Sequence, residues 1–330
     1  MNRRTFLAAS AALTFAPRAS GQDISLHFDD AAAYSRPRRG VSLLVMRRGR
    51  VIFEDYPQPG APGHGWELAS GTKSFTGVMA AAAVKDRLLD LDEPAANALP
   101  EWRSDPMKRR ITIHQLLSLE SGLQAGVIGR PPTYAAAIET PALYEPGSKF
   151  EYGPAPFQIF GEIMRRKTGA DPLLYLTRRI FDPLAIAPTD WRRGADGMPF
   201  MPQGAQFTAR DWAKFGEWVR TGGGDLVDRA ALAQCFAPSR ANPGYGMSWW
   251  LLREGLIPPG RMAGVSFDAA MSERYGVIRM AAGAGDQRLY IVPDLALVVA
   301  RQADQILRGM FARGPARWSD GAFLTTLLGG

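Results

Sequence analysis

The stretch WELASGTKSFTG (residues 66–77) places a hydroxyl and an amine three positions apart, at Ser70 and Lys73. If a helix begins at or just before Ser70, positions i and i+3 share one face, so the lysine amine can reach the serine oxygen. A desolvated lysine holds some neutral amine and can accept the serine proton. The helix N-terminus would supply N–H groups to a developing oxyanion. Spacing alone fits equally a serine N-cap followed by a surface lysine.

Hydrophobic periodicity predicts strands towards both ends of the chain and helices between them. Residues 70–89 are expected to be helical, because apolar side chains and alanines alternate there as in a mostly buried helix. The segments 40–46 and 51–55 predict a hairpin around a glycine-containing turn. Further helices are expected at 111–119 with Thr112 as N-cap, 157–167, 173–180, 209–221 and 320–328, and further strands at 248–252, 275–280, 288–292 and 295–301.

This order predicts an α/β plus all-α fold, with one sheet built from both termini and a helical domain inserted in the middle. We expect a single catalytic unit over 22–330. Its sheet subdomain would comprise about 22–84 and 241–330, and its helical subdomain about 85–240. A cleft is expected where the two meet, which is a common place for an active site.

The amino-terminal residues predict an export signal. Twin arginines, Arg3 and Arg4, precede an apolar run at 8–16 and small residues at 19–21. This is the pattern of a twin-arginine signal peptide, assigned to residues 1–21. The apolar run is too short to span a bilayer, for which about 20 residues are needed. We therefore expect a periplasmic or secreted protein without stable membrane insertion after the signal is removed.

Composition argues against several other classes of protein. The formal charge of +7 falls to +4 without Arg3, Arg4 and Arg18 (7 − 3), and no aromatic ladder accompanies the basic residues, so nucleic acid is not an expected partner. The single Cys235 excludes an internal disulfide, and three scattered histidines predict no metal site. No cofactor is expected, the partner is a small-molecule acyl substrate, and the sequence leaves the oligomeric state open.

A second informative stretch is PGSKFEYGP (residues 146–154), which precedes an apolar helix. A tyrosine held on such a rigid loop, here Tyr152, can project its phenol into a cleft. On its own it could equally pack over the start of the helix.

Together these stretches resemble the serine beta-lactamase-related hydrolases, namely class C beta-lactamases, DD-carboxypeptidases, family VIII esterases and 6-aminohexanoate-dimer-hydrolase-like enzymes. The resemblance covers nearly the whole mature chain. It is carried by SGTKSFTG (70–77), LDLDEP (89–94), ITIHQLLSLESGL (111–123), Pro146-Gly147 with Tyr152, FDPL (181–184) and YGMSWW (245–250).

The resemblance implies a beta-lactamase/transpeptidase-like fold, with a mainly antiparallel sheet and flanking helices. It implies that Ser70 is the acyl-forming nucleophile and that Lys73 and Tyr152 share the acid and base work. It also implies an oxyanion hole made by the Ser70 N–H and one N–H on the C-terminal edge strand. Either Lys73, with a depressed pKa, or Tyr152, as a phenolate, could be the general base, and the sequence leaves both open.

Two motifs depart from the pattern of the lactam-hydrolysing members. Their Tyr-x-Asn becomes Tyr152-x-Pro154, which lacks the amide donor. Their Lys-Thr-Gly is replaced by MAAGAGDQ (280–287), which lacks the cation. Glycines in this segment still permit close backbone approach, so an oxyanion N–H near Ala284 is predicted. The candidate oxyanion and substrate-binding residues are therefore Ser70, Gly283, Ala284, Gly285, Asp286 and Gln287, the last two having ordinary turn residues as the alternative interpretation.

The loss of both substrate-holding groups argues against efficient penicillin or cephalosporin hydrolysis, because a substrate carboxylate would lack a compensating cation. We expect an esterase or amidase for small acyl compounds, with weak beta-lactamase activity at most. The rival interpretation is a binding protein with a relic site. A Ser-His-Asp hydrolase is disfavoured because the chain has no G-x-S-x-G elbow and His114 lies in an expected structural helix.

Overall fold

The computed structural model describes residues 25–260 and 264–329. The predicted signal peptide lies outside these residues and stays a prediction. Within the described segments, no helix combines the length and apolar character needed to cross a bilayer.

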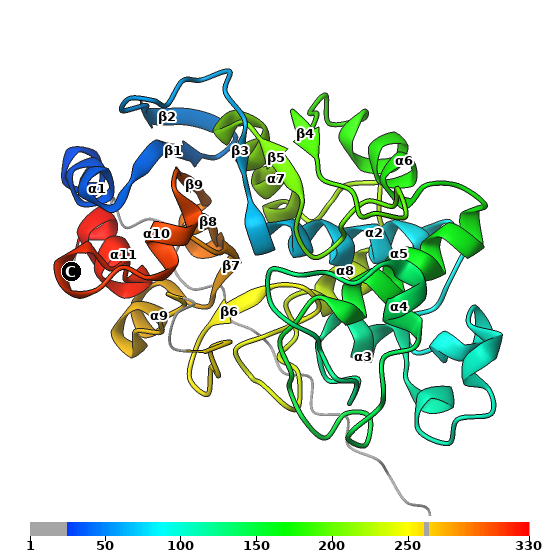
Figure 1. Cartoon of the computed structure of the whole chain (residues 1–330). Coiled ribbons are helices and arrows are strands. Elements are labelled where there is room, and N and C mark those ends of the chain that lie inside the picture. The colour runs from blue at the N-terminus through cyan, green and yellow to red at the C-terminus, as the bar shows by residue number, and fades with distance from the viewer. Residues whose placement is uncertain (1–24, 261–263, 330) are drawn as a thin grey trace, which may run out of the picture.

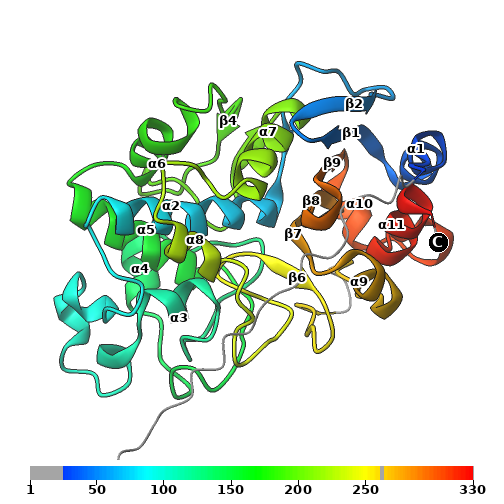
Figure 2. The ribbon, with the colours of Figure 1, turned by 180° about the vertical axis from the view of Figure 1, so that it is seen from behind.

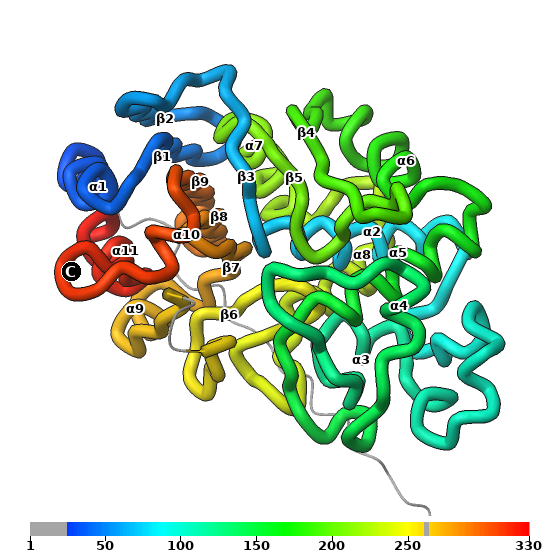
Figure 3. Tube along the Cα trace, in the orientation of Figure 1, coloured from blue at the N-terminus to red at the C-terminus, as the bar shows by residue number. Residues whose placement is uncertain are grey.

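A six-stranded antiparallel sheet is built from both ends of the chain, in the order β2-β1-β9-β8-β7-β6 (Figure 1). The N-terminal strand β1 lies beside the C-terminal strand β9, with Val45 opposite Val299. The blue and red parts of the trace accordingly lie together in Figure 3. This confirms the predicted fold class. The strands are β1 (Gly40–Arg47), β2 (Arg50–Asp55), β6 (Trp250–Leu252), β7 (Ile278–Gly283), β8 (Gln287–Val292) and β9 (Leu297–Ala303).

Helices cover both faces of this sheet (Figures 1 and 2). On one face α7 (Ala209–Arg220) packs so closely that a Cβ added at Gly216 would lie 2.9 Å from Val298. On the other face lie α1 (Phe28–Ser35) and α11 (Asp320–Leu328), where Tyr290 of β8 stacks on Phe323. Helix α7 thus packs on the sheet although it belongs by sequence to the predicted helical subdomain.

The helical part surrounds α2 (Lys73–Lys85), which follows the 3₁₀ turn Ala69–Thr72. Phe75 anchors this helix among aromatic rings, with centroids 4.6 Å from Phe215, 5.1 Å from Phe207 and 5.3 Å from Phe181. The other elements are α3 (Ile113–Leu117), α4 (Tyr134–Ile138), α5 (Ala155–Thr168), α6 (Pro172–Leu176) with a π turn to Phe181, α8 (Arg229–Gln234) and a small sheet β3-β5-β4 (Trp66–Glu67, Ala205–Phe207, Asp190–Trp191).

Most predicted elements are present, and Thr112 caps α3 in a capping box with Gln115. The strand predicted at 275–280 is wrong at its start, because Tyr275 ends helix α9 (Ala269–Tyr275). Gly276, at a φ of +70°, turns the chain before β7 begins at Ile278. Among the described residues, five helices were not predicted, namely α1, α4, α8, α9 and α10 (Ile306–Met310).

Candidate active site

Ser70 lies in the 3₁₀ turn that precedes α2, so the nucleophile candidate precedes the α-helix rather than lying within it. The residue before it, Ala69, has a φ of +45°, a strained conformation of the kind that clusters at functional sites. Thr72 fastens the turn: its hydroxyl donates to the Ala69 carbonyl oxygen (2.7 Å) and accepts from the Ala205 N–H (3.2 Å). These bonds fix the position of the Ser70 backbone.

The Lys73 amine is aimed at Ser70 from the first turn of α2. Its Nζ lies 3.0 Å from Ser70 Oγ and donates to the Pro202 carbonyl oxygen, also at 3.0 Å. Lys73 is only 4% exposed. Burial lowers the pKa of its amine to about 7, and among the described residues no carboxylate forms an ion pair with it. A substantial share of neutral amine is therefore present near neutral pH.

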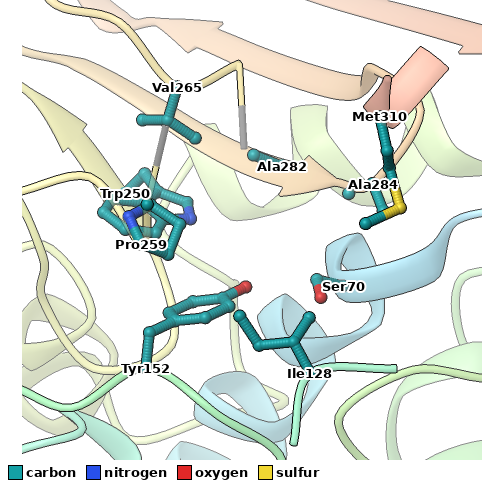
Figure 4. A pocket seen from close by; sticks show the side chains of 11 residues that line it. Ser70, Ile128, Tyr152, Trp250, Pro259, Val265, Ala282, Ala284 and Met310 are labelled. Carbon is teal, nitrogen blue, oxygen red and sulfur yellow. The ribbon is translucent and has the colours of Figure 1, made fainter. Parts of the chain in front are cut away.

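Tyr152 completes the group from the loop before α5. Its hydroxyl points towards Ser70 (Figure 4), and Lys73 Nζ lies 4.9 Å from its ring centroid. Desolvation raises the pKa of the Tyr152 hydroxyl to about 12, although hydrogen bonds with Ser70 and Trp250 and the charge of Arg288 act in the opposite direction. The phenol therefore keeps its proton at neutral pH.

Gly153, the residue after Tyr152, allows the loop before α5 to approach the site closely. A Cβ at Gly153 would lie 2.2 Å from the Ala125 carbonyl oxygen, so only glycine permits this close approach.

Ser70 and Tyr152 open onto a cavity of about 310 Å³ (Figure 4). Its opposite wall is the end of β7, where a Cβ on Gly283 would lie 2.0 Å from the Leu68 carbonyl oxygen. The turn that carries Ser70 and the C-terminal end of β7 are thus in direct contact. Strand β7 is an inner strand, because β6 pairs with its first residues, Ile278–Met280. The cavity is formed by Ser70, Ile128, Tyr152, Trp250, Pro259, Gly260, Val265, Ala282, Gly283, Ala284 and Met310, and none of these described residues carries a charge.

The structure brings Gly283 and Ala284 to Ser70 but not the side chains of Asp286 and Gln287. The Asp286 carboxylate pairs with Arg39 at 2.9 Å. The Gln287 side-chain amide makes two hydrogen bonds with the Ala303 backbone. Its Nε2 donates to the Ala303 carbonyl oxygen at 2.7 Å, and its Oε1 accepts from the Ala303 N–H at 3.0 Å. Neither residue lines the Ser70 cavity: both side chains hold the β7–β8 turn, together with Gly285 at a φ of +71°. This arrangement fits the alternative interpretation of Asp286 and Gln287 as turn residues.

Sequence reasoning missed two buried arginines behind this turn. Arg288 and Arg301 lie opposite each other on β8 and β9, and both are fully buried. Arg288 Nη1 donates to the Gly283 carbonyl oxygen (3.0 Å), and Arg301 Nη1 donates to the Asp286 carbonyl oxygen (2.7 Å). Both guanidinium groups therefore hold the backbone next to Ala284. Because side chains along a strand alternate between its two faces, the sequence could place Arg288 and Arg301 on the face covered by α1 and α11. The sequence of either strand alone does not show that these two residues lie opposite each other.

Sequence reasoning also missed much of the apolar wall. Ile128, Pro259, Val265 and Met310 come from loops and a short helix far apart in the chain, and no local pattern joins them. No group of three or more His, Cys, Asp or Glu side chains that could hold a metal ion occurs within residues 25–260 and 264–329.

The chain matches the family described as Beta-lactamase over residues 26–301, and it belongs to that family. It is 25% identical over 174 residues to Protein flp of Staphylococcus aureus (strain N315), covering 47% of this chain and 35% of that protein. It is 28% identical over 150 residues to a lovastatin esterase of Penicillium rubens, covering 36% of this chain and 37% of the esterase. The matched region thus spans about a third of these curated relatives.

Among solved structures, a class C beta-lactamase from Rhodobacter sphaeroides has the same fold, with a TM-score of 0.68 at 20% identity over 90% of this chain and 99% of that one. The family match and the shared fold therefore agree with each other.

Proposed function

We propose that this protein hydrolyses small esters or amides through an acyl-enzyme on Ser70, with Lys73 as general base and Tyr152 as the proton donor to the leaving group. The observation that carries the proposal is the 3.0 Å contact between Ser70 Oγ and a buried Lys73 amine whose pKa is about 7. The alternative base, a Tyr152 phenolate, is disfavoured by a pKa of about 12.

In the proposed acylation, Ser70 Oγ attacks the carbonyl carbon while its proton passes to Lys73. The resulting oxyanion accepts hydrogen bonds from the N–H groups of Ser70, on the 3₁₀ turn, and Ala284, the residue that follows β7. As the carbon bond to the leaving oxygen or nitrogen breaks, Tyr152 gives it a proton and regains one from the Lys73 ammonium. Water then attacks the ester of Ser70 by the same route and releases the acid.

The residues that line the cavity favour a substrate whose acyl group is uncharged and apolar. The described residues that line the cavity offer no cation to a substrate carboxylate, and Pro154 lacks the side-chain amide of the lactam-hydrolysing members. The lovastatin esterase relative supports ester chemistry in this family. We therefore propose an esterase or amidase with weak beta-lactamase activity at most.

Covalent labelling tests the nucleophile. A fluorophosphonate probe is expected to tag the purified protein at Ser70, because a serine beside a neutral amine attacks phosphorus. Ser70→Ala should abolish the tag, and Ser74→Ala, which removes a buried hydroxyl one turn away, should retain it. A folded wild-type protein that stays unlabelled would contradict the proposal and favour a binding protein with a relic site.

Substrate preference tests the cavity. The kcat/KM for p-nitrophenyl butyrate is expected to exceed that for nitrocefin by at least about tenfold, a difference of about 1.4 kcal/mol in transition-state binding. The reason is the nitrocefin carboxylate, which would be desolvated without a partner. Steady-state kinetics with both substrates on the same preparation measures the ratio, and Ser70→Ala gives the background. Equal or faster nitrocefin hydrolysis would contradict the assigned substrate class.

A further inference from the structure

Large apolar side chains are exposed around the mouth of the Ser70 cavity. They come from the loop of residues 126–130, the loop of residues 256–260 and the segment of α10 and its C-cap. Their exposed fractions run from 44% to 70%, and the five residues, here called the apolar rim, are Val127, Ile128, Ile257, Leu307 and Phe311. Leu307 lines neither the Ser70 cavity nor the two cavities beside it, and it is included because it lies on α10, four residues before Phe311. Exposed apolar groups that gather in one region mark an interaction surface rather than scattered surface residues.

The rim is continuous with the catalytic cavity. A neighbouring cavity lined by Val127 and Ile257 shares Tyr152 and Pro259 with it. On the other side, a cavity lined by Phe311 shares Met310 with it. In Figure 4, Ile128 and Met310 lie on the same side of the cavity as Ser70. A partner that covers the rim would therefore also cover the entrance to Ser70.

The charge around the rim favours an anionic partner. The segments 124–130, 149–152, 256–260 and 305–317 contain five exposed basic residues, Arg130, Lys149, Arg308, Arg313 and Arg317. They contain one acidic residue, Glu151, which lies 3.6 Å from Lys149. Exposed Leu, Ile and Phe side chains set among Lys and Arg are the composition that binds the surface of an anionic bilayer, where the apolar groups enter the acyl boundary and the cations meet lipid headgroups.

We propose that the apolar rim and its basic residues dock the protein onto an anionic lipid surface, and that Ser70 draws an apolar ester from that surface. The second half of this proposal rests on the proposed hydrolase function. The first half does not, because docking requires no catalysis. The exposed rim and the described lining of the cavity, none of which is charged, then form one continuous apolar path from the lipid to the nucleophile.

Vesicle cosedimentation of the full-length Ser70→Ala protein tests docking without turnover. We expect at least about tenfold tighter binding to phosphatidylglycerol-containing vesicles than to pure phosphatidylcholine vesicles, with affinity falling as salt is raised. Leu307→Ser with Phe311→Ser should weaken binding to both kinds of vesicle by about tenfold or more. Arg308→Gln with Arg313→Gln should weaken binding to the anionic vesicles alone. The matched control is Leu174→Ser, which removes a leucine 39% exposed from α6, a helix outside the segments that form the rim.

Several results would overturn the proposal. One is equal binding to both vesicle types, and another is wild-type binding by the double rim variant. A wild-type dimer that becomes monomeric in that variant would show that the face binds a second copy instead. In the active background, the same double variant should lose hydrolysis of a vesicle-embedded long-chain ester but not of p-nitrophenyl acetate. Equal loss on both substrates would indicate a damaged site and would overturn the second half of the proposal, in which the rim delivers the ester from the lipid. Absence of ester hydrolysis in the wild type, with vesicle binding intact, would refute the proposed function and the second half of this proposal, while docking would stand.

Discussion

Replacing Lys73 with methionine is expected to lower kcat/KM for p-nitrophenyl butyrate by about 10³-fold, the scale of a lost general base. Methionine keeps the length and the apolar stem of the side chain but has no proton acceptor. Because Lys73 is buried in contact with Ser70 and the Pro202 carbonyl group, the substitution removes the amine without opening a large cavity. Lys85→Met, at the exposed end of the same helix, is the matched control and should retain full activity.

The pH profile separates loss of a base from general damage. Burial lowers the pKa of Lys73 from 10.5 to about 7, so the neutral amine is lost as pH falls through that value. The wild-type kcat/KM should fall about tenfold per pH unit below pH 7 and level off above it. Lys73→Met should lack this slope. A variant that kept the slope would show that another group titrates, and a variant that kept the rate would show that Lys73 is not the base.

The same pKa has a consequence for stability with a definite sign. Between about pH 7 and pH 10.5 the unfolded chain holds a proton on Lys73 that the folded chain has lost, so wild-type stability gains from rising pH in this window. Below pH 7 the buried ammonium opposes folding. Lys73→Met should therefore unfold at no lower urea concentration than the wild type at pH 6, which identifies its activity loss as chemical.

Asp320→Asn is expected to lower the free energy of unfolding by about 3–5 kcal/mol, the cost of leaving a buried charge uncompensated. Asp320 Oδ1 accepts from Arg288 Nε at 2.7 Å and from Trp318 Nε1 at 2.9 Å, and both charged side chains are fully buried. The variant has nearly the same shape but leaves the Arg288 cation without its carboxylate. Urea unfolding followed by tryptophan fluorescence measures the change.

The control for this prediction is the exposed ion pair between Glu54 and Arg210. Its distance of 2.7 Å is the same as that of the buried pair, but the Arg210 side chain is exposed. Glu54→Gln should cost less than about 1 kcal/mol, as surface pairs do. If Asp320→Asn lowered the free energy of unfolding no more than Glu54→Gln does, the ion pair between Arg288 of β8 and Asp320 of α11 would not stabilise the fold as predicted.

The sequence was sufficient where the pattern is local. The spacing of Ser70 and Lys73 predicted their contact, and the hairpin, α5, α7 and α11 follow from periodicity within single segments. The pairing of Arg288 with Arg301 was not predictable, because it depends on the register between β8 and β9. The position of Asp286 likewise depends on Arg39, which is remote in sequence. The sequence around Asp286 gives no sign of the ion pair that it forms with Arg39 in the fold.

The contact between Gly283 and the Leu68 carbonyl group also bears on the order in which the parts of the candidate active site are synthesised and assembled. The nucleophile is made early in synthesis, whereas the strand that faces it is made near the end, and β9 must then insert between β1 and β8. A nascent or truncated polypeptide that lacks the last strands thus carries Ser70 and Lys73 but not β7 and the Ala284 N–H. On the proposed mechanism such a fragment is inert, and catalytic competence arises only once the ribosome has released the last strands and the two ends of the chain have joined.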